Sequence, residues 1–188
     1  MRIISGSARG TKLLTLEGEN TRPTSERAKE AVFSILQFEL RERRVLDLFA
    51  GSGQLALEAL SRGASSAVLC DASSAAARVI AANVEKTHCK DRCRLLCADY
   101  LDCIRTLQGE QFDLVFLDPP YAQGLLVPAL RALCEANLLA DGAVVVCESG
   151  HADILQEDAA LQDKFTVRKV AKYGVAHVSV LEYANAKE

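Results

Sequence analysis

Two patterns of hydrophobic and polar residues alternate along most of this chain. From residue 44 onward, short and almost wholly apolar runs are separated by longer segments in which apolar residues recur every three or four positions. Apolar runs of this length predict buried strands, and the helical spacing between them predicts helices. The alternation therefore predicts an α/β fold, in which helices cover both faces of a parallel sheet.

Seven strands are predicted. Five of them alternate with helices, and the last two flank Gly174, which predicts an antiparallel hairpin at the edge of the sheet. The predicted strands are 45–49, 67–70, 94–97, 112–117, 143–147, 165–172 and 175–183, and the predicted helices are 54–61, 73–86, 101–107, 125–135 and about 152–161. The expected architecture is an open, twisted, Rossmann-like sheet.

The first 43 residues follow a different pattern. Residues 2–5 and 11–16 predict a short β-hairpin, and apolar residues at helical spacing between 28 and 40 predict a first helix. Residues 1–44 contain nine Arg and Lys against six Glu, a net charge of +3, so the remainder carries −6 of the total of −3. We expect residues 1–43 to form an appendage that meets phosphates, residues 44–188 to form the main fold, and both to make one compact domain.

Composition narrows the class of protein. A chain of 188 residues that is 49% hydrophobic and 25% charged fits one globular domain. No apolar run is long enough to cross a membrane, and the polar start has no signal-peptide pattern, so a cytoplasmic protein without a membrane partner is expected. Cys89, Cys93 and Cys97 beside His88 match neither the common zinc nor the iron–sulfur spacings. We expect reduced thiols and no metal.

Four carboxylates follow successive predicted strands. Asp47 lies near the end of the first strand, Asp71 ends the second, and Asp99 and Asp118 follow the third and fourth. Ligands of open α/β sheets bind outside the carboxyl ends of the strands. The four residues therefore predict a ligand site along one edge of the sheet.

The segment Asp118-Pro119-Pro120-Tyr121 directly follows a predicted strand. Alone, it also fits a turn with a packed tyrosine. Beside the other carboxylates, it predicts a clamp for a flat heterocycle that bears an amine, because Asp118 accepts hydrogen bonds, the prolines are rigid and Tyr121 offers a stacking surface.

A glycine loop, residues 47–53 (DLFAGSG), joins the first strand to its helix. Gly51-x-Gly53-x-x-Ala56 with Asp71 also matches the dinucleotide fingerprint, so an NAD-dependent oxidoreductase is an alternative. Charge favours another cofactor, because Asp47 disfavours a pyrophosphate and favours the sulfonium and ammonium groups of S-adenosylmethionine. Asp71 suits a ribose diol and Asp99 an adenine amine. The residues expected to contact this cofactor are Asp47, Ala50, Gly51, Gly53, Asp71, Asp99, Tyr100 and Asp118.

Six motifs in this order resemble one family. They are residues 2–6 (RIISG), 9–13 (RGTKL), 22–27 (RPTSER), 46–53 (LDLFAGSG), 57–64 (LEALSRGA) and 112–121 (FDLVFLDPPY). The chain resembles the bacterial 16S rRNA guanine-N2 methyltransferases of the RsmD type, although Asp71 stands where that family often has Glu.

The resemblance implies a seven-stranded S-adenosylmethionine-dependent methyltransferase fold and transfer of a methyl group to the N2 amine of a guanine in 16S rRNA, with S-adenosylhomocysteine as product. It implies a substrate within the small ribosomal subunit or its assembly intermediate, and we expect a monomer. The implied catalytic residues are Asp118, Pro119, Pro120 and Tyr121, and the expected RNA contacts are Arg9, Lys12, Arg22, Thr24 and Arg27.

Two further alternatives stay open from the residues. A DNA methyltransferase that modifies adenine N6 or cytosine N4 needs the same clamp, although residues 1–43 offer little room for a DNA-recognition domain. A non-catalytic RNA-binding protein with this fold is the other. Neither the modified nucleotide nor the assembly state of the substrate follows from the sequence itself.

Overall fold

A computed structural model describes residues 1–16, 23–120, 123–156 and 158–185, except for the side chains of residues 23–25. Tyr121 and Arg22, two of the residues that the sequence singles out, lie outside these ranges, as does the side chain of Thr24.

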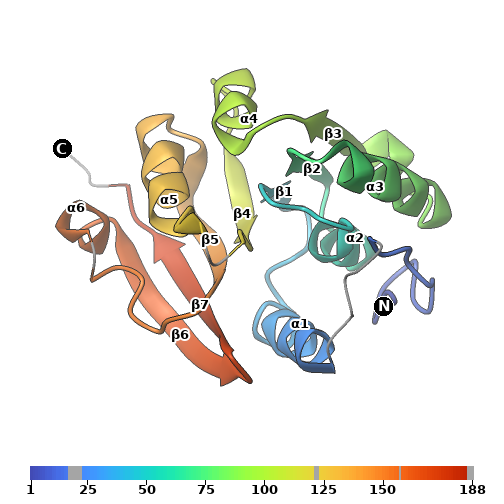
Figure 1. Cartoon of the computed structure of the whole chain (residues 1–188), viewed down its shortest axis with the longest axis horizontal. Helices are drawn as coiled ribbons and strands as arrows, with labels where there is room; N and C mark the ends of the chain where they lie inside the picture. Colours follow the sequence, from blue (N-terminus) through green and yellow to red (C-terminus); the bar gives the residue numbers. More distant parts are fainter. Residues whose placement is uncertain (17–22, 121–122, 157, 186–188) are drawn as a thin grey trace.

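A seven-stranded sheet forms the centre of the molecule, with the strand order β3-β2-β1-β4-β5-β7-β6 (Figure 1). Strands β1 to β5 are parallel, and β7 is antiparallel to both β5 and β6. The strands are β1 (Arg44–Asp47), β2 (Ser66–Asp71), β3 (Cys93–Cys97), β4 (Phe112–Leu117), β5 (Leu139–Ser149), β6 (Phe165–Tyr173) and β7 (Ala176–Tyr183). The predicted parallel sheet and its antiparallel edge hairpin are confirmed.

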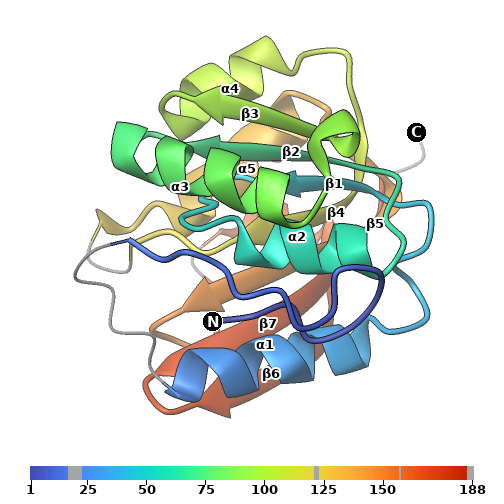
Figure 2. The ribbon, with the colours of Figure 1, turned by 90° about the vertical axis from the view of Figure 1, so that its right-hand side faces the viewer.

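Helices cover both faces of the sheet, as predicted. One buried apolar cluster joins α1, α2 and α3 to one face, and a second joins α4, α5 and α6 to the other. Figure 2 shows α1, α2 and α3 in front of the strands. The helices are α1 (Pro23–Ile35), α2 (Gln54–Ser61), α3 (Ser74–Lys86), α4 (Tyr100–Thr106), α5 (Leu126–Glu135) and α6 (Ala159–Gln162), with a 3-10 turn η1 (Lys90–Arg92) before β3. None of the described helices is long and apolar enough to cross a membrane.

The helix predicted at about residues 152–161 is wrong for most of its length. Only α6 is helical there, and it begins at Ala159 after the capping residue Asp158, whose side chain accepts a hydrogen bond of 3.0 Å from the backbone N–H of Ala160. Ile154 and Leu155 precede the helix in a turn and are buried in the second apolar cluster. Their apolar character comes from that packing and not from a helical period.

The N-terminal hairpin is shorter in regular structure than predicted. One isolated antiparallel bridge, between Arg2 and Lys12, replaces the two predicted strands. The segment remains ordered because it packs on the rest of the molecule: Ile3 and Leu13 are buried in the first apolar cluster. Backbone hydrogen bonds also join its two arms, from the Ile3 N–H to the Thr11 carbonyl at 3.0 Å and from the Leu13 N–H to the Met1 carbonyl at 3.1 Å.

A buried carboxylate holds the hairpin on α2. The two oxygens of Glu58 accept hydrogen bonds from the backbone N–H groups of Ile4 and Ser5, at 2.8 and 3.0 Å. The same side chain lies 3.2 Å from the Lys29 Nζ and 2.7 Å from the Arg62 Nε, and it is fully buried. This network joins α1, α2 and the first residues of the chain.

Candidate active site

A cavity of about 610 Å³ lies at the carboxyl ends of the strands. It lies where the chain reverses direction across the sheet, since β1 has β2 on one side and β4 on the other. Such a switch point is the usual ligand site of an open α/β sheet. The cavity is lined by Leu16, Leu48, Phe49, Gly51, Asp71, Ala72, Ser73, Ala76, Asp99, Tyr100, Asp118, Pro119, Pro120, Gln123 and Leu125.

Most of the predicted cofactor-binding and catalytic residues meet at this cavity. Three of the four carboxylates line it, together with Gly51, Tyr100, Pro119 and Pro120. Asp47, Ala50 and Gly53, which also belong to the glycine loop, are buried and do not line the cavity. The sequence therefore identified residues from four separate segments that the fold brings to one place.

The glycine loop needs its two glycines for different reasons. Gly53 has a φ of 78°, and a Cβ there would lie 3.0 Å from the Leu69 Cδ2, so both its backbone and the packing disfavour a side chain. Gly51 has a φ of 55°, but a Cβ there would meet nothing within 4 Å. Because Gly51 lines the cavity, the open space beside it is available to a ligand.

Asp47, the first residue of the glycine loop, is buried. Its Oδ2 accepts a 3.4 Å hydrogen bond from the backbone N–H of Ala56 at the start of α2, whereas its Oδ1 has no hydrogen-bond partner among the described residues. The pKa of this carboxyl is raised to about 7, chiefly by burial. The hydrogen bond from the Ala56 N–H opposes this shift, and the nearby carboxylate of Asp71 adds to it. A buried oxygen without a partner fits a cationic group of a ligand.

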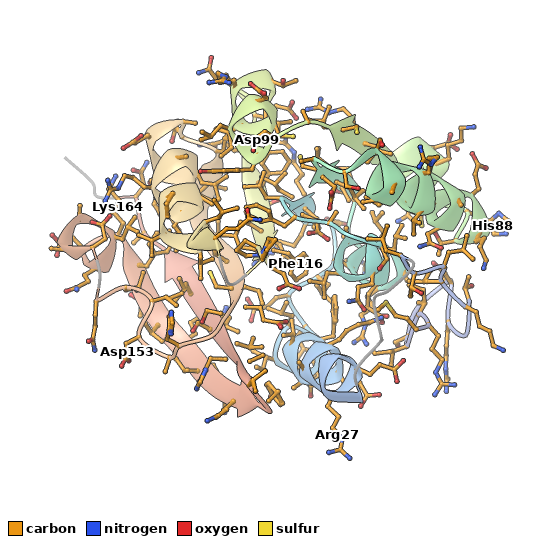
Figure 3. All side chains as sticks on the ribbon, viewed as in Figure 1. Arg27, His88, Asp99, Phe116, Asp153 and Lys164 are labelled. Atoms are coloured by element: carbon orange, nitrogen blue, oxygen red, sulfur yellow. The ribbon has the colours of Figure 1, made fainter. Side chains whose placement is uncertain are left out.

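Asp71 and Asp99 each bind the backbone at the edge of the cavity. Asp71 accepts hydrogen bonds from the N–H groups of Gly51, at 2.9 Å, and Ser73, at 2.8 Å. Asp99 caps α4 by accepting a 2.9 Å bond from the Leu101 N–H, and Figure 3 labels it at the start of that helix. Each carboxylate oxygen has more than one lone pair, so both residues retain acceptor capacity for hydroxyl or amine groups.

An aromatic pair forms part of the cavity wall. The rings of Phe49 and Tyr100 lie 5.6 Å apart between centroids, and both line the cavity. Phe49 was absent from the predicted site, although it lies within the glycine loop. Leu16, Gln123 and Leu125 were also missed, because nothing local in the sequence connects these separate segments to the loop.

The predicted clamp directly follows β4. Asp118 is half-buried, Pro119 is buried and Pro120 is exposed, and all three line the cavity. The Pro120 carbonyl accepts a 3.1 Å hydrogen bond from the N–H of Gln123. The arrangement places a carboxylate and two rigid residues beside the glycine loop, as a group transfer between two ligands requires.

The predicted RNA contacts are spread over the molecule. Arg9 is exposed in the hairpin turn, which the Ser7 N–H joins to the carbonyl of Ser61 at the C-terminal end of α2. Since α2 begins behind the glycine loop and is about 12 Å long, Arg9 lies at the end of the sheet away from the cavity. Lys12 is exposed along the same segment, and Arg27 points away from α1 into solvent (Figure 3).

The ranges that the structure describes contain no cluster of side chains that could bind a metal ion. No three His, Cys, Asp or Glu side chains there lie close enough together to hold an ion. The seven cysteines are free thiols, and Cys70, Cys89, Cys103 and Cys147 are buried.

Comparison with known proteins identifies the family. The model of the family described as conserved hypothetical protein 95 matches residues 1–182. Ribosomal RNA small subunit methyltransferase D of Haemophilus influenzae is 36% identical over 151 residues, which are 79% of this chain and 78% of that protein. The protein of the same name from Escherichia coli is 35% identical over 149 residues, 79% of this chain and 74% of that protein.

A solved structure agrees with these relatives. A conserved hypothetical protein from Streptococcus pyogenes is 38% identical and superimposes with a TM-score of 0.75, covering 85% of this chain and 98% of that one. The matched family model spans nearly the whole chain, from the hairpin to the last strand. The chain therefore belongs to the conserved hypothetical protein 95 family, and it is an RsmD-type methyltransferase.

Proposed function

We propose that this protein transfers a methyl group from S-adenosylmethionine to the exocyclic N2 amine of a guanine in 16S ribosomal RNA, with S-adenosylhomocysteine as product. The observation that carries the proposal is the cavity of about 610 Å³, which joins the glycine loop to the Asp118-Pro119-Pro120 segment. A methyl transfer needs a donor site and an acceptor site in direct contact, and this cavity borders candidates for both.

Charge at the loop supports the donor. S-adenosylmethionine, when bound, supplies a methyl group on a positively charged sulfur. The partnerless Oδ1 of Asp47 suits a cationic group, Asp71 suits a ribose diol, and Asp99 with Tyr100 suits an adenine ring and its amine. An NAD-dependent oxidoreductase fits less well, since three carboxylates line the cavity and disfavour a negatively charged pyrophosphate.

Asp118 is proposed to orient the acceptor amine. The lone pair of an aromatic amine is delocalised into the ring, so the nitrogen is a weak nucleophile. Hydrogen bonds from its two protons to the Asp118 carboxylate and the Pro119 carbonyl localise that pair and direct it toward the methyl group. The methylated nitrogen then loses one proton, for which Asp118 is the adjacent acceptor. Pro120 keeps this segment rigid, and Tyr121 is proposed to stack on a base rotated out of its helix.

The names of two relatives support the proposed substrate. Two proteins that are 35 and 36% identical to this chain are named ribosomal RNA small subunit methyltransferase D. We therefore propose 16S rRNA as partner, within the small ribosomal subunit or its assembly intermediate, and a monomer as the active form. A single flipped base brought to the strand ends meets both the clamp and the cavity.

Residues 1–43 are proposed to be the RNA-contact appendage of a methyltransferase unit, 44–188, with both parts in one compact domain. Arg9, Lys12 and Arg27 are exposed, as phosphate contacts require; Arg22 and Thr24 complete the proposed set. The double variant Arg9→Ala/Lys12→Ala should bind RNA more weakly and with a smaller salt dependence, at unchanged affinity for S-adenosylhomocysteine. Unchanged RNA affinity would remove both residues from the interface.

Methyl transfer can be tested directly. Small subunits from a strain that lacks the enzyme are incubated with the protein and tritiated S-adenosylmethionine, and the labelled nucleosides are then identified. Label should appear in N2-methylguanine, and Asp118→Asn should lower the rate by about 100-fold or more. Asp163→Asn, which removes an exposed carboxylate far from the cavity, is the control. Label in N6-methyladenine or in DNA would contradict the proposal.

A further inference from the structure

A second carboxylate stands beside Asp118 at the edge of the sheet. Strands β4 and β5 pair in parallel with Phe116 opposite Val146 and Leu117 opposite Cys147. Asp118 directly follows β4 and Glu148 is the next residue of β5, so a continued register places their backbones about 5 Å apart.

Both side chains project toward the same face of the sheet. Phe116 and Val146 are buried in the cluster on the α1 side, whereas Leu117 and Cys147 are buried on the opposite side. Because side chains alternate along a strand, Asp118 and Glu148 return to the α1 side. A cavity of about 60 Å³ between α1, α2 and the strand ends is accordingly lined by both carboxylates.

Glu148 also borders the other side of the clamp. A second small cavity, of about 70 Å³, is lined by Glu148 together with Pro119 and Pro120. The Glu148 side chain is half-buried, so it remains accessible to a group that enters between the clamp and the end of β5. Glu148 thus borders one cavity with Asp118 and another with Pro119 and Pro120, the residues that are proposed to hold the amine.

Two neighbouring carboxylates match one base better than the others. The edge of guanine next to its N2 amine carries the N1–H, so this base presents two adjacent donors. Adenine and cytosine place a ring nitrogen with a lone pair beside their amine, and that lone pair faces a second carboxylate unfavourably. Resting on the proposed methylation of a guanine, we infer that Glu148 is a specificity residue, which accepts the N1–H of the target base while Asp118 holds its N2 amine.

The inference is tested with a base that keeps the amine and loses the N1–H. In 2-aminopurine the N2 amine is present and N1 is an acceptor. Small subunits are reconstituted with 16S rRNA that carries guanine or 2-aminopurine at the methylated position. For the wild-type protein, kcat/KM should be at least about tenfold lower with 2-aminopurine, because a hydrogen bond to a charged group is lost.

The variant Glu148→Gln isolates the residue. An amide can turn its NH2 group toward N1 of 2-aminopurine and donate a hydrogen bond to it. The ratio of kcat/KM with guanine to kcat/KM with 2-aminopurine should therefore be about tenfold or more lower in the variant than in the wild type. Intrinsic differences in nucleophilicity between the bases cancel in this comparison. Asp153→Asn, an exposed carboxylate in the segment after β5, is the matched control and should leave the ratio unchanged.

The outcomes separate this inference from the proposed function. If the wild-type protein produces no N2-methylguanine, both fail. If it methylates guanine and Glu148→Gln leaves the ratio unchanged while binding S-adenosylhomocysteine normally, only the role of Glu148 fails. Should the variant not fold, the wild-type comparison can still contradict the inference, because equal rates with the two bases exclude recognition of the N1–H.

Discussion

The carboxylate of Asp71 joins the end of β2 to the glycine loop, because its Oδ2 accepts a 2.9 Å hydrogen bond from the backbone N–H of Gly51. Its Oδ1 accepts a second bond, of 2.8 Å, from the N–H of Ser73, which caps α3. The residue proposed to bind a ribose diol therefore also fixes the loop on one side of the cavity and the start of a helix on the other.

Replacing this carboxylate should affect the cofactor more than the fold. In Asp71→Asn one of the two backbone N–H groups loses its acceptor and faces an NH2 group, and the diol loses a charged acceptor. We expect affinity for S-adenosylhomocysteine to fall by about 10- to 100-fold and the free energy of unfolding by about 1 to 2 kcal/mol. Calorimetric titration and urea unfolding measure the two effects. Asp91→Asn, an exposed carboxylate in η1, is the control, and a purely structural loss would contradict the assignment.

The two glycines of the loop should separate stability from binding. Both have positive φ, which costs an alanine about 1 to 2 kcal/mol. Gly53→Ala adds a 3.0 Å contact with Leu69, so it should destabilise the protein more than Gly51→Ala. Gly51→Ala places a methyl group in the open cavity. Compared with Gly53→Ala, it should therefore lower cofactor affinity more and stability less. Thermal unfolding and calorimetry of both variants would reveal any reversal of this order.

Much of the sheet was predictable because its signals are local. The strand 112–117 and the helix 54–61 have the predicted bounds, since each is a mostly apolar run or a helical period with a clear end. The carboxylates after the strands were equally visible, and a parallel sheet necessarily brings the ends of its strands to one edge. Asp71, Asp99 and Asp118 meet at one cavity for that reason.

What the sequence did not reveal depends on contacts between distant segments. Glu58 lies within a predicted helix, and nothing around it in the sequence indicates its bonds to Ile4 and Ser5, which span more than fifty residues. Leu16 lines the cavity only because the N-terminal segment runs along α2 and α3, where the Leu14 N–H bonds to Asn83 at 2.8 Å. No local period encodes such packing, and the same limit explains the shortened α6.

The buried ion pair between Lys29 and Glu58 should be far more sensitive than an exposed one. Both side chains are almost completely buried, at 2 and 0% exposed, and they lie 3.2 Å apart. Glu58→Gln leaves the Lys29 ammonium buried without its counter-charge, which should cost about 3 to 5 kcal/mol in the free energy of unfolding. Urea unfolding measures this loss.

A matched pair on the surface provides the control. Glu85 and Lys90 form a 3.0 Å ion pair with both side chains largely exposed, and Glu85→Gln should cost less than about 1 kcal/mol. In addition, Glu58→Gln/Lys29→Met should recover part of the stability, because the unpaired charge is removed. Similar losses in Glu58→Gln and Glu85→Gln would show that burial does not control the strength of this pair.

Burial of Asp47 should make stability depend on pH between about 4 and 7. Its pKa is raised from 3.8 to about 7 in the folded protein, so folding favours the neutral carboxyl. The unfolded chain ionises near pH 4; the contribution of Asp47 to stability is therefore fully present below that pH and is lost as pH rises to 7. At 1.36 kcal/mol per pKa unit, the loss is at most about 4 kcal/mol.

Asp47→Asn removes this titration and tests its link to the ligand. The difference in unfolding free energy between variant and wild type should shift in favour of the variant from pH 4.5 to 7 and stay constant above pH 7.5, as measured by urea unfolding. Because Oδ1 is proposed to face a cationic group, the same variant should bind S-adenosylmethionine at least about tenfold more weakly at pH 8, where wild-type Asp47 is ionised. If the unfolding free energies of variant and wild type instead change with pH in parallel, Asp47 is ionised in the folded protein over the whole pH range. Weaker binding without a change in the pH dependence of stability would assign Asp47 to the ligand site but contradict a raised pKa in the folded protein.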